Sequence, residues 1–98
     1  MHMNADEQHA IETFGHMEKP VRLEINNSGA WELLGSFDAA DDFLFDHVLS
    51  AASQLAQALV AGGNRLTLRV SSGDGPHVVL MRWSDQYSGW RNALGGVE

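Results

Sequence analysis

The amino-acid sequence predicts an α+β protein, a two-layer sandwich in which one long helix covers one face of a four-stranded antiparallel sheet. Two segments in which apolar and polar residues alternate precede a long segment with a 3.6-residue apolar period, and two more alternating segments follow it. Clusters of Asn, Gly and Pro separate these segments, as expected of turns. The predicted element order is therefore β-β-α-β-β, and a chain of 98 residues with 44% hydrophobic content suits a single domain.

The first two strands form a predicted hairpin. Charged residues alternate with apolar ones from Val21 to Ile25, which is typical of a half-buried strand. The sequence Asn26–Gly29 predicts a turn, because Asn and Gly tolerate positive φ, and Gly35 marks a bulge or bend in the second strand. The residues expected to face the helix are Val21, Leu23, Ile25, Trp31, Leu33 and Phe37.

A helix is predicted from about Ala39 to Ala61. Asp38 is the expected N-cap, and the glycine pair that begins at Gly62 would end the helix. The apolar stripe that would pack on the sheet consists of Leu44, Val48, Ala51, Ala52, Leu55 and Leu59.

The second predicted hairpin joins a strand at residues 65–70 to a strand at residues 77–83. The loop between them contains Gly73-Asp74-Gly75, and because no helix follows it, it predicts a hairpin connection rather than a phosphate-binding loop. In the fourth strand the register that places Arg82 outward points Val79, Met81 and Trp83 toward the helix. No further strand is predicted after Ser84, where Trp90 is the single large apolar anchor.

The two ends of the chain differ in pattern from its middle. Residues 1–19 are expected to be a tail, either a short helix capped by Asn4 or a stretch left from cloning, and residues 20–98 form the domain. The N-terminus lacks the pattern of a signal peptide, and no apolar run is long enough to span a membrane. Without cysteines, disulfides and thiolate ligands are excluded, and we expect a cytoplasmic protein.

Acidic residues are concentrated in the first half of the chain. Residues 1–49 hold ten of the 13 acidic residues and two basic ones, whereas residues 50–98 hold three acidic and four basic residues. The formal net charge is −7, which opposes binding to nucleic acid or to an anionic membrane surface. A protein is therefore the expected kind of partner.

One helix can cover only one face of the sheet, so the other face is the first candidate for a contact surface. Strict alternation would place Leu34, Val78 and Leu80 on that open face among charged side chains. A homodimer could bury them by setting the acidic hairpin of one copy against the arginine-bearing hairpin of the other. In the alternative interpretation, the charges pair within one sheet.

The second candidate is an aromatic and basic cluster near the C-terminus. The members of this cluster, which could form the centre of a protein-binding site, are Arg82, Trp83, Tyr87, Trp90 and Arg91. Alternatively, Trp83 belongs to the core and Trp90 pins the C-terminal segment, with the arginines stacked on the rings. The predicted interaction residues are Leu34, Arg65, Arg69, Val78, Leu80, Arg82, Tyr87, Trp90 and Arg91. The alternative surface on the helix consists of Asp42, Phe43, Asp46 and His47.

No constellation of residues predicts catalysis or metal binding. Ser50 could reach His47 on a helix, but Asp46 points about 100° away from His47 and cannot orient its imidazole. The histidines His2, His9 and His16 recur every seven residues, a spacing too long for one metal ion. We therefore expect no enzymatic activity, no cofactor and no bound metal.

The sequence leaves three classes of function open and identifies no known family. The first is a non-catalytic interaction module, acting through the open sheet face and the aromatic-arginine cluster as a homodimer. The second is an acidic inhibitor, of the immunity-protein type, that antagonises a basic partner. The third, a small enzyme or ligand-binding protein, has the least support, because a thin core leaves little room for a pocket.

Overall fold

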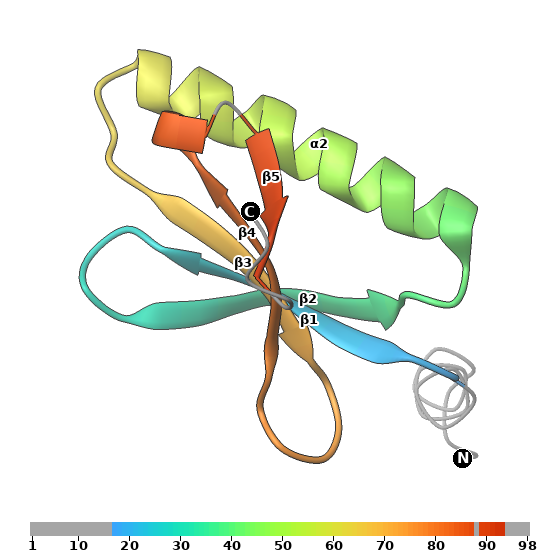
Figure 1. Cartoon of the computed structure of the whole chain (residues 1–98). Helices are drawn as coiled ribbons and strands as arrows, with labels where there is room; N and C mark the ends of the chain where they lie inside the picture. The colour runs from blue at the N-terminus through green and yellow to red at the C-terminus, as the bar shows by residue number, and fades with distance from the viewer. Residues whose placement is uncertain (1–16, 88, 94–98) are drawn as a thin grey trace, which may run out of the picture.

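The computed structural model describes residues 17–87 and 89–93 and contains one antiparallel sheet with one long helix (Figure 1). The strands pair in the order β2-β1-β3-β4-β5. The predicted α+β class is confirmed, although the predicted sheet of four strands is wrong, since this one has five. The elements in chain order are β1 (Pro20–Asn26), β2 (Trp31–Asp38), α2 (Asp42–Ala61), β3 (Thr67–Ser72), β4 (Val79–Ser84), the short 3-10 helix η1 (Asp85–Tyr87) and β5 (Gly89–Asn92).

The unpredicted strand β5 turns back along β4 after η1. Gly89 has φ +145°, a conformation that L side chains rarely adopt, so glycine suits the sharp reversal that begins the strand. Trp90 then lies opposite Trp83, and its indole Nε1 donates a hydrogen bond to the Leu49 carbonyl of α2 at 2.9 Å. A strand of four residues with one apolar anchor is too short to show an alternating pattern, which is why sequence periodicity did not reveal it.

Two irregularities in the sheet change which residues face the helix. Between β1 and β2 the register shifts so that Leu23 lies opposite Gly35 and Glu24 opposite Leu33, which leaves Leu34 as the additional residue. Between β3 and β4, Leu80 is left over in the same way. A β-bulge places one extra residue in a strand and reverses the alternation beyond it. The bulge predicted near Gly35 is therefore present.

Helix α2 begins later than predicted. Asp41, not Asp38, caps the helix, and its Oδ1 accepts a hydrogen bond from the Leu44 N–H at 3.0 Å. The Asp38 carboxylate instead accepts hydrogen bonds from the backbone N–H groups of Glu18, Lys19 and Ala40. Asp38 therefore ties the end of β2 to the chain that leads into β1, and it is not available to cap the helix.

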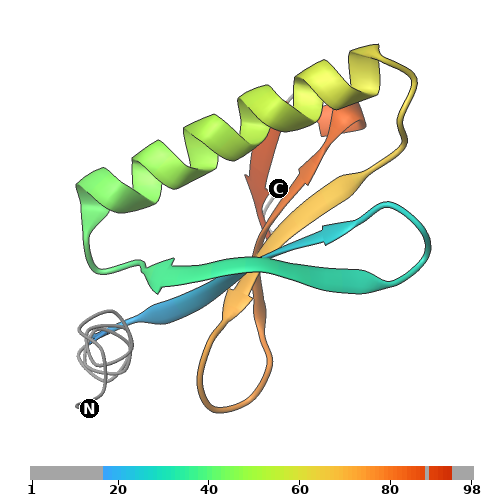
Figure 2. The same ribbon diagram turned by 180° about the vertical axis from the view of Figure 1, so that it is seen from behind.

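The core lies between α2 and one face of the sheet, and Figure 2 shows the helix crossing that face from behind. Near the start of α2, Phe45 packs against Phe37 of β2 with ring centroids 5.9 Å apart. Near its end, Ala56 packs into a cluster that contains Trp83, whose Nε1 donates a hydrogen bond to Ser53 Oγ at 3.0 Å. The buried hydrophobic residues are Val21, Leu23, Phe37, Leu49, Ala56, Leu66, Leu68, Val70 and Trp83.

The predicted loop between the last two long strands is confirmed as a hairpin connection. Gly73 lies so close to β1 that a Cβ there would sit 2.9 Å from the Pro20 carbonyl, so this position requires glycine. Its N–H donates a hydrogen bond to the same carbonyl at 2.8 Å.

Within the described part of the chain, no helix is both long and apolar enough to cross a membrane. Residues 1–16, with His2, His9 and His16, lie outside the described residues.

Candidate functional site

The sheet face opposite α2, here called the outer face, is organised around a buried carboxylate. Glu24 is only 4% exposed, and its Oε1 accepts hydrogen bonds from Arg69 Nε at 2.7 Å and from Ser71 Oγ at 2.9 Å. Arg22 Nε lies 3.7 Å from Glu24 Oε2, and His77 Nε2 lies 3.6 Å from Oε1, at ion-pair distance when the histidine is protonated. This acid thus pairs with basic residues of its own sheet.

The surroundings of Glu24 change its acidity. Burial acts to raise the pKa of Glu24, but hydrogen bonds from Arg69 and Ser71, together with the positive charges of Arg69 and His77, act in the opposite direction and hold the pKa below its ordinary value. Glu24 is therefore ionised at neutral pH, and its negative charge compensates the positive charge of the nearest guanidinium groups.

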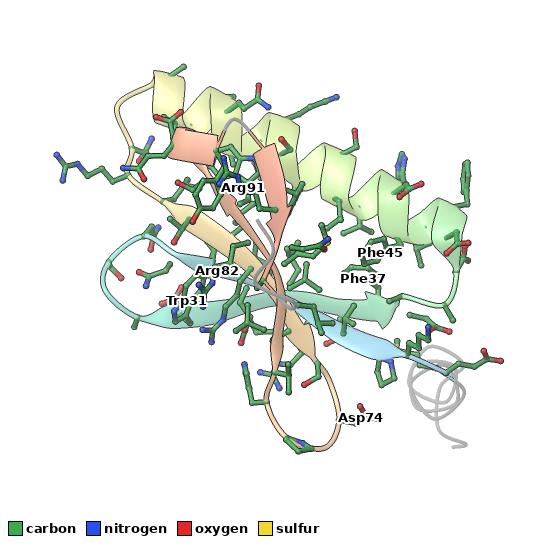
Figure 3. All side chains as sticks on the ribbon, in the orientation of Figure 1. Trp31, Phe37, Phe45, Asp74, Arg82 and Arg91 are labelled. Carbon is green, nitrogen blue, oxygen red and sulfur yellow. The ribbon has the colours of Figure 1, made fainter. Side chains whose placement is uncertain are left out.

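Three arginines lie side by side across the outer face, and we call them the arginine row. Arg69 of β3 lies opposite Arg82 of β4, and Arg82 lies opposite Arg91 of β5. The Arg69 guanidinium stacks over the Trp31 ring at 4.1 Å from its centroid, and the Arg91 guanidinium stacks over Tyr87 at 4.4 Å. Figure 3 shows Trp31, Arg82 and Arg91 following one another across the sheet. The row thus carries an aromatic ring at each end.

A small concavity lies at the β5 end of the row. Its volume is about 160 Å³, and it lies at β4, η1 and β5, next to the strand that carries Arg69. We call it the Arg82–Arg91 concavity, and its lining consists of Arg82, Tyr87, Arg91, Asn92 and Ala93.

A second surface, on the helix side of the sheet, is apolar. The edge strand β2 and the second half of α2 leave a narrow opening between them, which we call the α2–β2 groove. Leu34 is 52% exposed there and Leu55 is 59% exposed, so two large apolar side chains on facing elements contact water. The groove is lined by Ile25, Leu34, Ala52, Leu55, Ala56, Leu59, Leu66 and Leu68.

The prediction of an apolar centre on the outer face is wrong for two of its three residues. Leu34 lines the α2–β2 groove on the helix side, and Leu80 is half-buried against the core that contains Val70. Both are the extra residues of β-bulges, which strict alternation assigns to the wrong face. Val78 is exposed at the base of the β3–β4 loop, where its N–H donates a hydrogen bond to Ser72 Oγ.

The bulges also reverse the orientation of three residues that were predicted to face the helix. Trp31 and Leu33, predicted to face the helix, lie beyond the β2 bulge opposite Asn26 and Glu24, and Trp31 stacks on Arg69 of the outer face. Val79, predicted to point inward, lies opposite Ser71, whose hydroxyl reaches the Glu24 network. Met81 and Trp83 face the helix as predicted.

The predicted aromatic-arginine cluster is divided between the two faces. Arg82, Tyr87 and Arg91 lie together on the outer face, whereas Trp90 packs against the core and is anchored to α2. Arg65 lies elsewhere, in the lining of a broad concavity of about 620 Å³ between the β1–β2 turn, the helix-to-β3 connection and η1. The structure therefore brings together three of these five residues.

The helix surface predicted as an alternative site is present at the start of α2. Phe43 is 84% exposed, and its ring stacks against the His47 imidazole with centroids 6.4 Å apart and planes 7° from parallel. Asp42 and Asp46 are exposed on the same turns of the helix. We call these four residues the Phe43 patch.

Some residues of these surfaces were not predicted as site residues. Alternation placed Glu24 on the outer face but could not show which basic residues surround it, and it assigned Trp31 to the helix side. The predicted core stripe of the helix is wrong for Leu44, Ala51, Leu55 and Leu59, which are exposed. The helix instead turns Phe45, Leu49, Ala52, Ala56 and Val60 toward the sheet, and this rotation leaves Leu55 and Leu59 at the groove. Among the residues that the structure describes, no three His, Asp or Glu side chains are grouped so that they could hold a metal ion.

Comparison of this chain with protein-family models, curated proteins and solved structures finds no match.

Proposed function

We propose that this protein is a non-catalytic interaction module that forms a homodimer through the α2–β2 groove. The observation that carries the proposal is the exposure of Leu34 and Leu55 on facing elements of a groove whose eight lining residues are all apolar. A contiguous apolar surface of this kind is typical of a site that a protein partner covers.

A second copy of the chain is a suitable partner for this groove. In a two-fold dimer the same patch meets itself, so Leu34 of one copy can pack against Leu55 and Leu59 of the other, and reciprocally. Leu59 is 37% exposed, so it is accessible for such a contact. A chain of this length builds only a modest core, and burying more apolar surface between two copies would add to its stability.

The open outer face is polar around Glu24 and is not the surface that this dimer buries. The dimer contact therefore lies on the helix side of the sheet, and not on the outer face, where the sequence pattern had placed it. The arginine row remains exposed to a further partner in such a dimer.

Measurement of the mass in solution tests the dimer. Size-exclusion chromatography with light scattering should give twice the monomer mass in the micromolar range, with dissociation on dilution. Leu55→Glu should yield a monomer, because a buried carboxylate in an apolar interface is strongly unfavourable. Gln54→Glu is the matched control, since Gln54 is exposed on the same helix as Leu55, does not line the groove and takes the same added charge.

Two results would refute the homodimer. One is a monomer at every concentration, and the other is equal loss of the dimer in both variants. The second result would mean that the charge change alone, and not the groove, is responsible.

A specific observation favours a second candidate function, that of an acidic antagonist of a basic partner. Phe43 is almost fully exposed between the carboxylates of Asp42 and Asp46. Aromatic side chains often contribute much of the energy at protein interfaces, and carboxylates at the rim steer a basic partner toward them. Nuclear magnetic resonance with an arginine-rich peptide should shift the Phe43 and His47 signals, less so at high salt, and Phe43→Ala should abolish the effect.

A further inference from the structure

We propose that the Arg82–Arg91 concavity binds a carboxylate group of an acidic peptide segment of a partner protein. This inference concerns a surface on the opposite side of the sheet from the α2–β2 groove, and it does not depend on the homodimer. It rests on the register of the arginines, on their unequal charge compensation and on the chemistry of the lining.

The register places the two arginines on neighbouring strands, and both line the concavity. Arg82 and Arg91 lie directly opposite each other on β4 and β5, and adjacent strands are about 4.8 Å apart. Directly opposed like charges destabilise a sheet, so an arrangement of this kind gains stability when an anion lies between them. A carboxylate has two oxygens that can each accept hydrogen bonds from a guanidinium group.

Charge compensation along the arginine row is unequal. Arg69 is paired with Glu24 at 2.7 Å. Over residues 17–87 and 89–93, by contrast, no carboxylate lies within 4.0 Å of the side-chain nitrogens of Arg82 or Arg91. Stacking on Tyr87 orients the Arg91 guanidinium without neutralising it. The positive charge of the row is thus concentrated at the concavity.

The lining of the concavity is rich in hydrogen-bond donors. Two guanidinium groups, which cannot accept hydrogen bonds, lie beside Tyr87, whose hydroxyl can donate one. Sites for drug-sized molecules occupy about 300–1,000 Å³, so a volume of about 160 Å³ suits a side-chain carboxylate rather than a cofactor.

The charge of the whole chain favours a carboxylate on a peptide over a nucleic acid. A chain of net charge −7 repels a densely charged phosphate backbone, and binding such a backbone generally needs several phosphate contacts from Lys and Arg. One or two carboxylates can pair with Arg82 and Arg91 at close range, with much less repulsion from the distant acids at ordinary ionic strength.

Titration of the full chain with a blocked hexaglutamate peptide tests the site. The Arg Nε–H signals of Arg82 and Arg91 and the ring signals of Tyr87 should shift in the nuclear magnetic resonance spectrum of the unaltered protein. Arg82→Ala and Arg91→Ala should each weaken binding at least about tenfold, or about 1.4 kcal/mol. The control is Arg65→Ala, which removes the same charge from an exposed arginine outside the concavity and should change the affinity less than about twofold.

Three outcomes would overturn the proposal. In the first, Arg65→Ala weakens binding as much as Arg82→Ala, which would indicate non-specific attraction to a basic protein surface. In the second, inorganic phosphate or a single-stranded oligonucleotide at matched ionic strength binds at the same signals more tightly than hexaglutamate, which would assign the site to phosphate. In the third, hexaglutamate shifts none of the signals of Arg82, Arg91 and Tyr87. Loss of the homodimer in Leu55→Glu, by contrast, should leave hexaglutamate binding unchanged.

Discussion

Replacing the Glu24 carboxylate with a neutral amide should destabilise the fold. Glu24→Gln removes the charge that compensates Arg69 and Arg22 but keeps the side-chain volume, so packing is conserved. A hydrogen bond to a charged group contributes about 1.5–3 kcal/mol, and we expect the free energy of unfolding to fall by about that amount. Urea denaturation measures it. Glu32→Gln, at an exposed position of β2, is the control and should change stability by less than about 0.5 kcal/mol.

The decrease of the free energy of unfolding at acidic pH, here called the acid limb, should depend on two carboxylates. Asp38, like Glu24, has a lowered pKa, because the N–H groups of Ala40 and Lys19 donate hydrogen bonds to its ionised form. A carboxyl whose pKa is lowered by folding stabilises the native state above its unfolded pKa, and this contribution is lost as the pH falls through the folded pKa. Stability should therefore change little from neutral pH to about pH 5 and should decrease below it.

Urea denaturation at a series of pH values measures this dependence. The ordinary pKa values of Glu24 and Asp38 are 4.5 and 3.8, so the decrease should begin near these values and continue below them. Glu24→Gln and Asp38→Asn should each flatten the acid limb. A protein that becomes more stable on acidification, or variants that keep the full pH dependence, would contradict the assignment.

At the scale of elements, the start of α2 depends on one capping residue. Asp41→Ala removes the acceptor of the Leu44 N–H and should lower the free energy of unfolding by about 1 kcal/mol. Asp46→Ala, one turn further along the exposed face, makes no such bond and should have a smaller effect. Urea denaturation of both variants gives the comparison. An equal loss in the two would mean that helix charge, rather than the cap, sets the stability of this end.

The long elements could be predicted from sequence because each shows its period over enough residues. Alternation located β1 and β3 and placed Arg22, Glu24, Arg69 and Arg82 on the outer face, where the structure has them. The bulges could not be placed in this way, since a single extra residue reverses every assignment beyond it. Gly35 indicated the first bulge but not which neighbour it would displace, and four consecutive apolar residues at 78–81 concealed the second.

The candidate sites were harder to predict than the elements. Arg82, Tyr87 and Arg91 are close in sequence, and a cluster could be expected there. The sequence left two roles open for Trp90, and the structure confirms the role of an anchor that pins the C-terminal segment to the core. The α2–β2 groove depends on which apolar face the helix turns toward the sheet, and its sequence offers two overlapping apolar stripes between which no local pattern decides.

At the scale of the whole molecule, the two proposed contact surfaces lie on opposite sides of one sheet. The groove lies between α2 and β2 at one edge, while the Arg82–Arg91 concavity lies on the outer face at the β5 edge. A dimer formed through the groove therefore leaves both arginine sites accessible. The module would present two equivalent carboxylate sites, which favours a partner with repeated acidic segments, because two linked contacts bind more tightly than one.

The two surfaces should respond to salt in opposite directions. Two copies of net charge −7 repel each other, so screening that repulsion should strengthen a dimer held by apolar contacts. Raising the ionic strength from about 0.01 M to about 0.15 M shortens the screening length from about 30 Å to about 8 Å, enough to show the effect on the dimer. Above about 0.15 M the distant acids are already screened, so the attraction of an acidic peptide to Arg82 and Arg91 should weaken as the screening length falls to about 3 Å at about 1 M.

Analytical ultracentrifugation and peptide titration in the same buffers measure the two responses. We expect the dimer dissociation constant to fall between about 0.01 M and about 0.15 M salt, and the hexaglutamate dissociation constant to rise between about 0.15 M and about 1 M. If the dimer weakened with salt, the copies would be held by opposite charges, as in an acidic patch meeting the arginine row, and the groove would not be the interface. If salt left peptide binding unchanged, Arg82 and Arg91 would not be holding a carboxylate.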